Sequence, residues 1–350
     1  MYVLAEESVT SLSVGIAGLG RFGRLHASVI HGLPGARVAA VFDPDPGARD
    51  RAVRDFGGCT PYSSFDALLR HPDLDCLYIV SPEDTHEAMV EQAIERGLPI
   101  FLEKPLALSA ARGAEIALAA GAAGVYLQVG FVVRFEARCG FLRDQIRGGK
   151  FGRIATFRAK RNCSRAWFEF YGDRAHAVYE TIIHDIDYLL WIVDSPCRSV
   201  YALEQNFSGR TYPDATMALL KFENGVMASL ETSWLTPAGA PANVLTDSWF
   251  GTIDSEIEVV GEYRSARLRI LESGLEIWSD DVNHHPEFGL WPEINGTIGG
   301  ALRAGDEHFL QVVSTGEPSS ITSVTDVVEG LRIAEAIVES ARSEKAVRFG

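Results

Sequence analysis

The sequence predicts an α/β protein with two domains, and three observations support this fold class. The chain has 350 residues, which is too long for one ordinary hydrophobic core. Its first third alternates short apolar runs with stretches of helical periodicity, whereas long alternating runs dominate the rest. We expect residues 1–130 to form a domain with a parallel sheet, and residues 131–350 to form an α+β domain with a large, mostly antiparallel open sheet.

Elements of the first domain follow from the spacing of its apolar residues. Short apolar runs predict buried strands at Leu12–Ala17, Ala36–Phe42, 76–80 and Ile100–Leu102. Apolar positions three or four apart predict helices at 48–56, Phe65–Leu69 and 86–96. Strands and helices in turn are typical of βαβ units, which build a parallel sheet.

The second domain has a different pattern of apolar residues. One helical stretch is predicted at 141–147 and a final helix at 324–342. Alternating runs predict antiparallel strands at 154–160, 216–222, 226–234, 255–260 and 266–271. The Asn-Gly step between Phe222 and Val226 predicts a hairpin, because these residues tolerate the positive φ angles of a tight turn.

Composition excludes several classes of partner. A formal net charge of −15 repels polyphosphate backbones, and no local cluster of Lys and Arg offsets it, so we expect no nucleic-acid partner. No apolar run reaches the roughly 18 to 20 residues of a membrane span, and residues 1–10 lack a basic n-region, so we expect neither a membrane partner nor a secretory signal. Five scattered cysteines predict free thiols and a cytoplasmic location: Cys59, Cys76, Cys139, Cys163 and Cys197.

A glycine motif predicts a dinucleotide site of the Rossmann type. Gly18-Leu-Gly20-Arg21-Phe22-Gly23 directly follows the first strand and opens a helix. Gly18 allows the tight turn, Gly20 admits a pyrophosphate close to the backbone, and Gly23 lets helix and strand pack closely. The unpaired N–H groups of the helix N-terminus then face the phosphates. The alternative is a glycine-rich turn without a ligand.

Asp43 predicts which dinucleotide is bound. It ends the second strand, about 20 residues after the last glycine, where an acid accepts hydrogen bonds from the adenosine ribose. A carboxylate there repels a 2′-phosphate, so NAD is favoured over NADP. Arg49 and Arg51 lie close in sequence and weaken that preference. The alternative is a strand-end Asp that starts a turn with Pro44.

Further segments carry a resemblance to a known family. Taken with the glycine motif, they resemble the Gfo/Idh/MocA dehydrogenases over nearly the whole chain. The segments are Ser81-Pro82 and His86 after the fourth strand, Phe101-Leu-Glu103-Lys104-Pro105 at the end of the fifth, Gln128-Val-Gly130-Phe131-Val-Val-Arg134-Phe135, Gly149-Lys-Phe-Gly152-Arg-Ile154 and the closing stretch 334–342.

The resemblance implies an activity and an assembly. Members of the family act on sugars, cyclitols and related compounds with a nicotinamide cofactor. Their lysine at the position of Lys104 is catalytic, and the neighbouring acid, here Glu103, lies near the nicotinamide. The outer face of their second-domain sheet often mediates oligomers, so the resemblance implies a homodimer or homotetramer formed through that sheet.

Lys104 also suits this chemistry on its own. It lies at the carboxyl edge of a predicted parallel sheet, where open α/β folds bind ligands. Its ammonium group can donate to the substrate oxygen, and we expect partial burial and the cationic nicotinamide to lower the pKa of Lys104. The alternative is a solvated lysine before a turn proline.

A second set of polar residues falls on one predicted helix. At helical spacing, Glu180, His184, Asp187 and Trp191 lie on a different stripe from the apolar one. An imidazole titrates near neutrality and can accept the alcohol proton, while Glu180 can hold it or bind a substrate hydroxyl. The alternative is a surface ion pair. The family usually has Asp at the position of Glu180; for Asp187, substrate contact and a position on the helix surface are equally open.

Other polar candidates keep two interpretations each. We expect Ser81, Pro82 and His86 near the cofactor, with a simple helix-start role as the alternative for His86. Arg134 is expected to meet the cofactor or substrate, and a structural salt bridge is equally open. Adjacent histidines at 284 and 285 point to opposite faces of a strand, so no metal is expected.

Aromatic residues add one more open point. Trp167, Trp191 and Trp234 can present apolar surface to a sugar ring, although tryptophans at regular spacing are usually core residues. We expect loops at 161–173 and 236–251 to shape the substrate site.

The sequence therefore favours an NAD-dependent dehydrogenase or reductase of a sugar, cyclitol or nucleotide-linked sugar. In this interpretation Lys104 and His184 share proton transfer, and Glu180 orients the substrate. Two rivals remain open. One is a glycoside hydrolase that keeps NAD bound and uses transient oxidation, and the other is a non-catalytic NAD-binding sensor. The sequence does not name the substrate.

Overall fold

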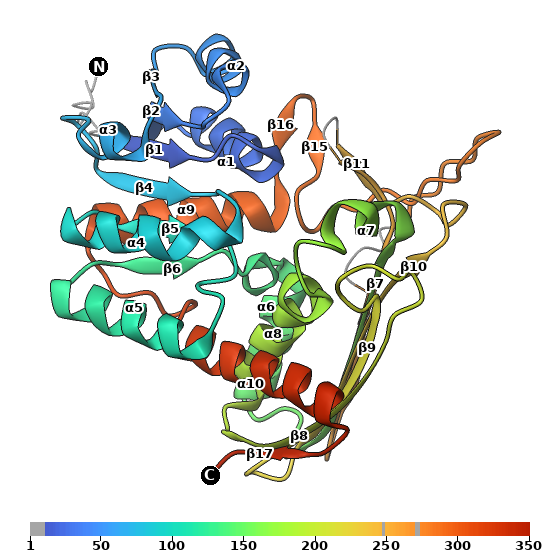
Figure 1. Cartoon of the computed structure of the whole chain (residues 1–350). Coiled ribbons are helices and arrows are strands. Elements are labelled where there is room, and N and C mark those ends of the chain that lie inside the picture. Colours follow the sequence, from blue (N-terminus) through green and yellow to red (C-terminus); the bar gives the residue numbers. More distant parts are fainter. Residues whose placement is uncertain (1–10, 247–248, 270–273) are drawn as a thin grey trace, which may run out of the picture.

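A computed structural model describes residues 11–246, 249–269 and 274–350 (Figure 1). Residues 1–10, on which the absence of a secretory signal is predicted, lie outside the described residues, as do 270 and 271 at the end of one predicted strand. Within the described ranges, no helix combines the length and apolar character needed to cross a bilayer.

The first sheet is parallel throughout and has six strands. Its order, β3-β2-β1-β4-β5-β6, reverses direction at β1, and open α/β sheets bind ligands at the carboxyl ends of the strands beside such a point. All four predicted strands are present, three of them with the predicted bounds. The strands are β1 (Leu12–Ala17), β2 (Ala36–Phe42), β3 (Thr60–Tyr62), β4 (Cys76–Ile79), β5 (Ile100–Leu102) and β6 (Leu127–Val129).

Helices on both faces of this sheet begin at recognisable signals. The carboxylate of Asp45 caps α2 by accepting the N–H groups of Gly47 and Ala48, and Pro46 occupies the first turn. Ser64 and Ser109 cap α3 and α5 in the same way. The helices are α1 (Arg21–His31), α2 (Pro46–Phe56), α3 (Phe65–Leu69), α4 (His86–Glu95), which follows a 3-10 turn at Glu83–Thr85, and α5 (Ala110–Ala123).

The second sheet has seven strands in the order β14-β13-β7-β10-β9-β8-β17. It is mostly antiparallel, as predicted, but β10 runs parallel to β7. The predicted hairpin joins β9 and β10, and Gly225 in its turn has a φ of 95°. The strands are β7 (Ile154–Ser164), β8 (Cys197–Gln205), β9 (Ala215–Phe222), β10 (Met227–Thr236), β13 (Ile253–Gly261), β14 (Ser265–Arg269) and β17 (Val347–Arg348).

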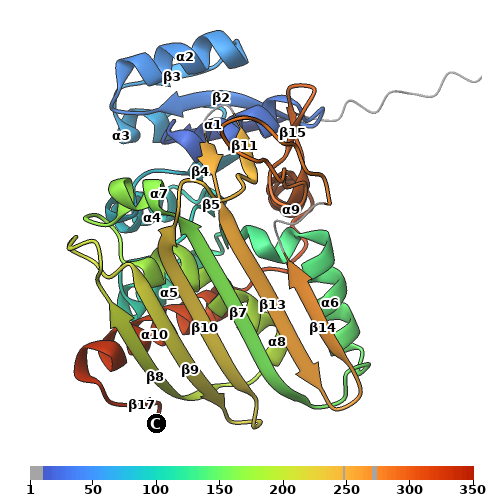
Figure 2. The same cartoon turned by 90° about the vertical axis from the view of Figure 1, so that its right-hand side faces the viewer.

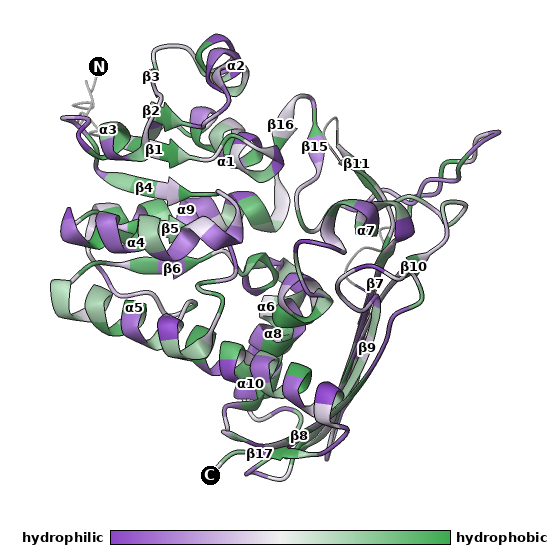
Figure 3. Ribbon diagram, viewed as in Figure 1, coloured by the Kyte–Doolittle hydropathy of each residue, from purple (hydrophilic) through white to green (hydrophobic). Residues whose placement is uncertain are grey.

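Helices cover only one face of this sheet. Figure 1 shows α6 (Ala137–Arg147), α8 (Ile183–Val193) and α10 (Val324–Ser343) between the two sheets. Figure 2 shows the opposite face with no helix in front of the strands. Green and purple alternate along α10 in Figure 3, because Val327, Leu331 and Ile337 turn inward while polar residues face solvent.

The chain returns to the first domain late in its course. Helix α9 (Gly300–Thr315), which the sequence patterns do not predict, places Phe309 and Leu310 in the same apolar core as Val14 and Tyr78. The division at residue 130 therefore stays a prediction, with α9 packing on the first sheet. Shorter elements connect the halves: a 3-10 turn at Val132–Phe135, α7 (Arg165–Tyr171), a π-helix at Val178–Ile182, and the small hairpins of β11 (Val244–Thr246) with β12 (Trp249–Gly251) and β15 (Glu293–Ile294) with β16 (Thr297–Ile298).

Candidate active site

One cavity lies where the carboxyl edge of the first sheet faces the second domain. The end of β5, strand β7, helices α7 and α8, and the segment around β12 all contribute to its walls. Tryptophans make up much of the apolar wall. The polar side chains that line it are Glu103, Lys104, Arg161, Glu180, Thr181 and His184.

Lys104 and Glu180 form an ion pair inside this cavity. Lys104 Nζ lies 2.7 Å from Glu180 Oε2 and also donates to the carbonyl oxygen of Glu180 at 3.2 Å. Burial is the largest single influence and lowers the pKa of Lys104, but the neighbouring groups, Glu180 foremost and then Glu103 and Tyr171, together outweigh it, so the net pKa is raised. The net rise differs from the lowered pKa expected from the sequence, because that reasoning did not include a carboxylate in contact with the amine, whereas the expected effect of the cationic nicotinamide stays a prediction.

His184 lines the same cavity and is neutral there. Burial lowers the pKa of His184 well below its ordinary value, and the positive charges of Lys104 and Arg161 add to this effect. Its Nδ1 atom is buried and has no hydrogen-bond partner among the described residues. The ring meets Phe131 edge to face at 6.0 Å between centroids. A neutral imidazole with a free nitrogen can accept a proton.

A π-helix at Val178–Ile182 brings Glu180 into the site. The segment adds a wider turn before α8, and such insertions in helices are frequent at functional sites. Thr181 fixes it by donating a 2.6 Å hydrogen bond to the carbonyl of Ala177. Glu180 and His184 thus share one cavity, as their spacing predicts, but Asp187 is not among the residues that line it.

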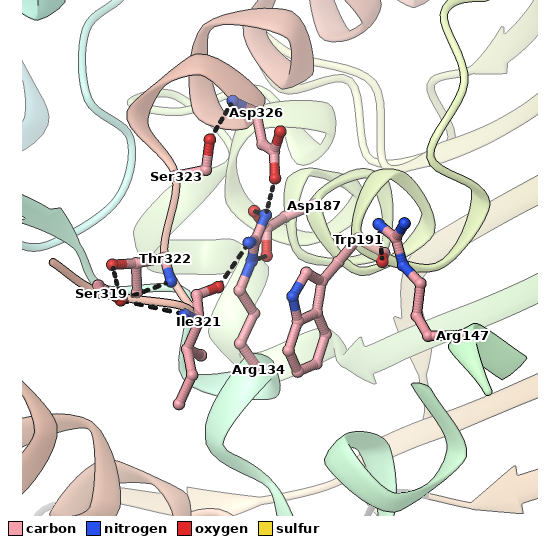
Figure 4. A network of polar contacts seen from close by, with 9 residues as sticks. All are labelled: Arg134, Arg147, Asp187, Trp191, Ser319, Ile321, Thr322, Ser323 and Asp326. Carbon is pink, nitrogen blue, oxygen red and sulfur yellow. Dashed lines mark hydrogen bonds and ion pairs between the residues drawn. The ribbon is translucent and has the colours of Figure 1, made fainter. Parts of the chain in front are cut away.

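Asp187 and Arg134 instead bind one another (Figure 4). Two hydrogen bonds of 2.8 and 2.7 Å join the guanidinium group to the carboxylate, and Arg134 also reaches Asp326 and the carbonyl of Ile321. The Arg134 side chain also lies against the ring of Trp191, 5.5 Å from its centroid. The structure thus places Arg134, predicted at the cofactor, and Asp187, predicted at the substrate, in a buried salt bridge away from the cavity.

The glycine turn has the shape that a pyrophosphate needs. Gly18 has a φ of 96°, and a Cβ on Gly23 would lie 2.0 Å from the carbonyl oxygen of Gly18, so neither position accepts a larger residue. A Cβ on Gly20 would meet nothing within 4 Å, so the backbone there is open. No side chain caps the N-terminus of α1, which leaves its N–H groups for an anion. These residues fit a dinucleotide.

Asp43 is held beside this turn. Its Oδ2 accepts the N–H of Leu19 at 2.8 Å, and its Oδ1 accepts the N–H of Asp45. Arg49 donates to the backbone carbonyl of Asp43, and Arg51 pairs with Asp45. The carboxylate therefore sits at the end of β2, where a ribose is expected.

Two cofactor candidates after β4 make contacts within the protein. The His86 ring is buried, with Nδ1 2.7 Å from the carbonyl oxygen of Pro105 and Nε2 2.9 Å from that of Ser81. His86 thus ties the end of β4 to the loop that follows Lys104. The Ser81 hydroxyl bonds to Thr85 at 2.6 Å. Neither residue lines the cavity, nor does Pro82, and their predicted contact with cofactor stays a prediction.

Sequence reasoning missed a buried histidine behind Glu103. In α1, His26 lies 2.7 Å from Asp306 and 3.3 Å from Glu103. Burial lowers the pKa of His26, but the two carboxylates outweigh it and raise the pKa to about 10. A histidine on the sheet-facing side of α1 is a signal that could have found it. Its partner Asp306 lies 280 positions away, on the unpredicted helix α9.

Sequence reasoning also missed two aromatic residues. Trp167 and Trp234 line the cavity, whereas Trp191 does not, and Trp249 and Trp291 join the first two there. Phe22 of the glycine motif lines it as well, and Arg21 lies over the Trp249 ring at 4.9 Å from its centroid. Among the described residues, no group of three His, Cys, Asp or Glu side chains is arranged to hold a metal ion.

Comparison with known proteins identifies the family. A model of the oxidoreductase family with an NAD-binding Rossmann fold matches residues 12–131, and a model of the GFO/IDH/MocA C-terminal domain matches residues 141–267. The inositol 2-dehydrogenase of Ralstonia nicotianae is 31% identical over 314 residues, which cover 83% of this chain and 88% of that protein. The chain belongs to the Gfo/Idh/MocA family.

This membership confirms the predicted family and an NAD-binding oxidoreductase. The scyllo-inositol 2-dehydrogenase (NAD(+)) of Bacillus subtilis is 26% identical over 345 residues, 95% of each chain. Among solved structures, GenD2 from gentamicin A biosynthesis in complex with NAD matches with a TM-score of 0.84 at 20% identity, over 100% of this chain and 99% of that one. This likeness confirms the fold predicted from the sequence.

Substitution of Arg134 distinguishes its two possible roles, a structural salt bridge with Asp187 and contact with the cofactor or substrate. Replacing Arg134 with Met should lower the free energy of unfolding by about 3–5 kcal/mol, because Asp187 then stays buried without a partner. NAD affinity of the folded variant should stay within about threefold of the parent. Urea unfolding and NAD titration measure the two effects. Arg332→Met, in an exposed pair with Glu329, is the control and should cost about 1 kcal/mol or less. A large loss of NAD affinity at unchanged stability would contradict the structural role.

The raised pKa of His26 predicts a pH dependence of stability. Because the folded pKa, about 10, exceeds the ordinary value of 6.5, the stabilisation is complete below pH 6.5 and is lost as the pH rises through 10. Thermal unfolding of the parent between pH 7 and 10 should therefore show a steeper loss than that of His26→Leu. The exposed His31→Leu, on the same helix, should follow the parent. Parallel curves for the parent and His26→Leu would show that His26 is uncharged.

Proposed function

We propose that the chain oxidises a secondary alcohol of a sugar or cyclitol with NAD, or reduces the corresponding ketone. One observation carries this proposal: Lys104, Glu180 and His184 meet in a single cavity at the carboxyl edge of the Rossmann sheet. Relatives named as inositol dehydrogenases support an alcohol of this class.

All five cysteines are buried free thiols, and a cytoplasmic location stays a prediction.

The chemistry requires two transfers. NAD held at the glycine turn would supply the acceptor for the hydride of the C–H bond, and the hydroxyl proton goes to a base on the protein. His184 can serve as the base, because its lowered pKa leaves the ring without the extra proton and its Nδ1 has no hydrogen-bond partner among the described residues. Because Glu180 helps to raise the pKa of Lys104, the amine stays protonated. It can donate a hydrogen bond to the substrate oxygen that becomes the carbonyl.

Glu180 has two tasks in this arrangement. Its carboxylate holds the Lys104 ammonium at 2.7 Å and retains acceptor capacity for a substrate hydroxyl. The family usually has Asp at this position. The side chain of Glu180 is one methylene longer, so the position of its carboxylate, and with it that of the sugar ring, should differ from that in relatives with Asp.

A substrate screen tests the proposed function. Sugars, inositols and aminosugars are incubated with NAD or NADP, and nicotinamide absorbance is followed. We expect net NADH formation with at least one polyol and a preference for NAD because of Asp43. Release of an aglycone without net NADH would instead support the hydrolase, and NAD binding without turnover across the panel would support the sensor.

Substitution of the two proton-handling residues gives a second test. Lys104→Ala and His184→Ala should each lower kcat by about a hundredfold or more, because each removes a group that donates to or accepts from the reacting oxygen. NAD binding should persist, since neither side chain belongs to the glycine turn. The exposed Lys345→Ala and His31→Ala are matched controls and should keep parental kcat. Near-parental kcat in either cavity variant would remove that residue from the mechanism.

We propose that the uncovered face of the second sheet forms a homodimer or homotetramer. Large apolar side chains on β8, β9 and β10 are exposed, on the sheet face that is turned toward the viewer in Figure 2, and contiguous patches of this kind usually mark interfaces. Charges of both signs lie beside them on neighbouring strands, so two copies of this face can pair opposite charges across a two-fold axis. The exposed apolar residues are Tyr201, Leu203, Met217, Leu219 and Met227.

A charge placed in this patch should disrupt the assembly. Leu219→Glu should lower the molar mass in solution toward that of one chain, because the interface would bury an unpaired carboxylate. Light scattering after size-exclusion chromatography measures the mass. Leu118→Glu, at a leucine on α5 that is also exposed, should leave the mass unchanged. A parent that is already monomeric would refute the proposed interface.

A further inference from the structure

Glu103 lies where the nicotinamide end of the cofactor has to be. The glycine turn follows β1 and Asp43 ends β2, so the sites for the pyrophosphate and the adenosine ribose lie on that side of the first sheet. The other half of the dinucleotide then extends across β1, over the ends of β4 and β5. Glu103 directly follows β5 and lines the cavity beside Lys104.

The Glu103 carboxylate is held in one place. Its Oε2 accepts the N–H of Lys104 at 3.2 Å, and its Oε1 lies 3.3 Å from His26 Nε2. A Cβ on Gly130 would lie 2.6 Å from Glu103 Oε1, so glycine is needed there to leave room for the carboxylate. The Glu103 side chain is 13% exposed, and solvent therefore screens its charge only weakly.

His26 does not cancel this charge, because Asp306 is its nearer partner. His26 Nδ1 lies 2.7 Å from Asp306 Oδ1, whereas its Nε2 lies 3.3 Å from Glu103, and both side chains of the His26–Asp306 pair are fully buried. One proton shared by an imidazole and a carboxylate leaves the pair neutral as a whole, whichever group holds it. Tyr78 packs on the His26 ring with centroids 5.5 Å apart and adds no charge, because burial raises the pKa of Tyr78.

The other charges of the cavity cancel one another. His184 is neutral, because burial lowers its pKa. Arg21 belongs to the glycine turn, where the pyrophosphate supplies the opposite charge. The remaining charged groups form two ion pairs, Lys104 with Glu180 at 2.7 Å and Arg161 with Asp185 at 2.6 Å. Among the described residues that line the cavity and their partners, the negative charge of Glu103 is therefore left over.

A carboxylate without a partner distinguishes the two forms of the cofactor. The oxidised nicotinamide ring carries a positive charge, whereas the reduced ring is neutral. Opposite charges a few Å apart in a partly buried site attract one another more strongly than they do in water. The oxidised form therefore gains an interaction with Glu103 that the reduced form lacks.

We propose that Glu103 selects the oxidised cofactor, and that Asp306 makes this selection possible by neutralising His26. Asp306 and His26 are positioning residues, because they act through Glu103. This inference rests on the NAD binding that the proposed function uses. Hydride transfer removes the positive charge of the ring, so the attraction is lost at the step that forms NADH, which favours its release.

Binding of three ligands measures this selection without a substrate. The dissociation constants of NAD, NADH and ADP-ribose, which lacks the nicotinamide, are determined by calorimetry at pH 7. Glu103→Gln should weaken NAD binding about tenfold or more and leave NADH and ADP-ribose within about threefold of the parent. Glu95→Gln makes the same charge change at an exposed residue of α4 and should leave all three constants unchanged.

Asp306→Asn tests the role of the buried pair. Without Asp306 a protonated His26 compensates Glu103, so at pH 6 the preference for NAD over NADH should fall about fivefold or more. The pKa of His26, about 10 in the parent, should fall without this carboxylate, so raising the pH to 9 should restore the preference, while the parental preference stays constant. His26→Gln combined with Asp306→Asn is neutral and should keep the parental preference at both pH values. The exposed Glu307→Gln, on the same helix, is the control.

The outcomes separate this inference from the proposed function. Equal losses of NAD and NADH affinity in Glu103→Gln overturn the inference, and so does a parental preference in Asp306→Asn at pH 6. If Asp306→Asn does not fold, the double variant decides, because a gain in NAD preference there would show that His26 already compensates Glu103 in the parent. A selective loss of NAD binding in Glu103→Gln without turnover of any polyol supports the inference and contradicts the proposed function.

Discussion

The ion pair between Lys104 and Glu180 is the contact on which the site depends. It joins the end of β5 to the π-helix before α8, so it exists only when the Rossmann sheet and the second domain meet. The pair determines which groups of the site are protonated. The Glu180 carboxylate keeps Lys104 charged, and the positive charge of Lys104 helps to keep His184 neutral. A cationic donor and a neutral acceptor thus line the same cavity at one pH.

Buried charges in and around the cavity fix the elements that carry these side chains. His26 links Glu103 to Asp306, Arg134 links the 3-10 turn after β6 to α8, and Arg161 links β7 to Asp185. Pairs of this kind contribute little net stability compared with apolar packing, but breaking one leaves an uncompensated buried charge. Their effect here is geometric, because each joins segments that are far apart in the sequence.

Sequence patterns predicted four of the six strands of the first sheet, because these are continuous apolar runs, but they did not predict β3, β6 or α5. They missed α9, because Gly300, Gly305 and Asp306 interrupt its apolar pattern and its inward face makes sense only against the Rossmann sheet. They also predicted Glu180 and His184 together from regular helical spacing. The same spacing predicted that Asp187 lies with them. In the structure the π-helix interrupts the regular spacing, and the salt bridge with Arg134 holds Asp187 outside the cavity.

The sequence by itself determined the kinds of elements, the glycine turn and the inventory of groups able to transfer protons, because these depend on near neighbours along the chain. Only the tertiary structure decided which residues pair with one another and which groups are charged. Lys104 meets Glu180 from 76 positions away and His26 meets Asp306 from 280. A pKa depends on burial and on charges nearby in space, and neither quantity can be read from spacing along the chain.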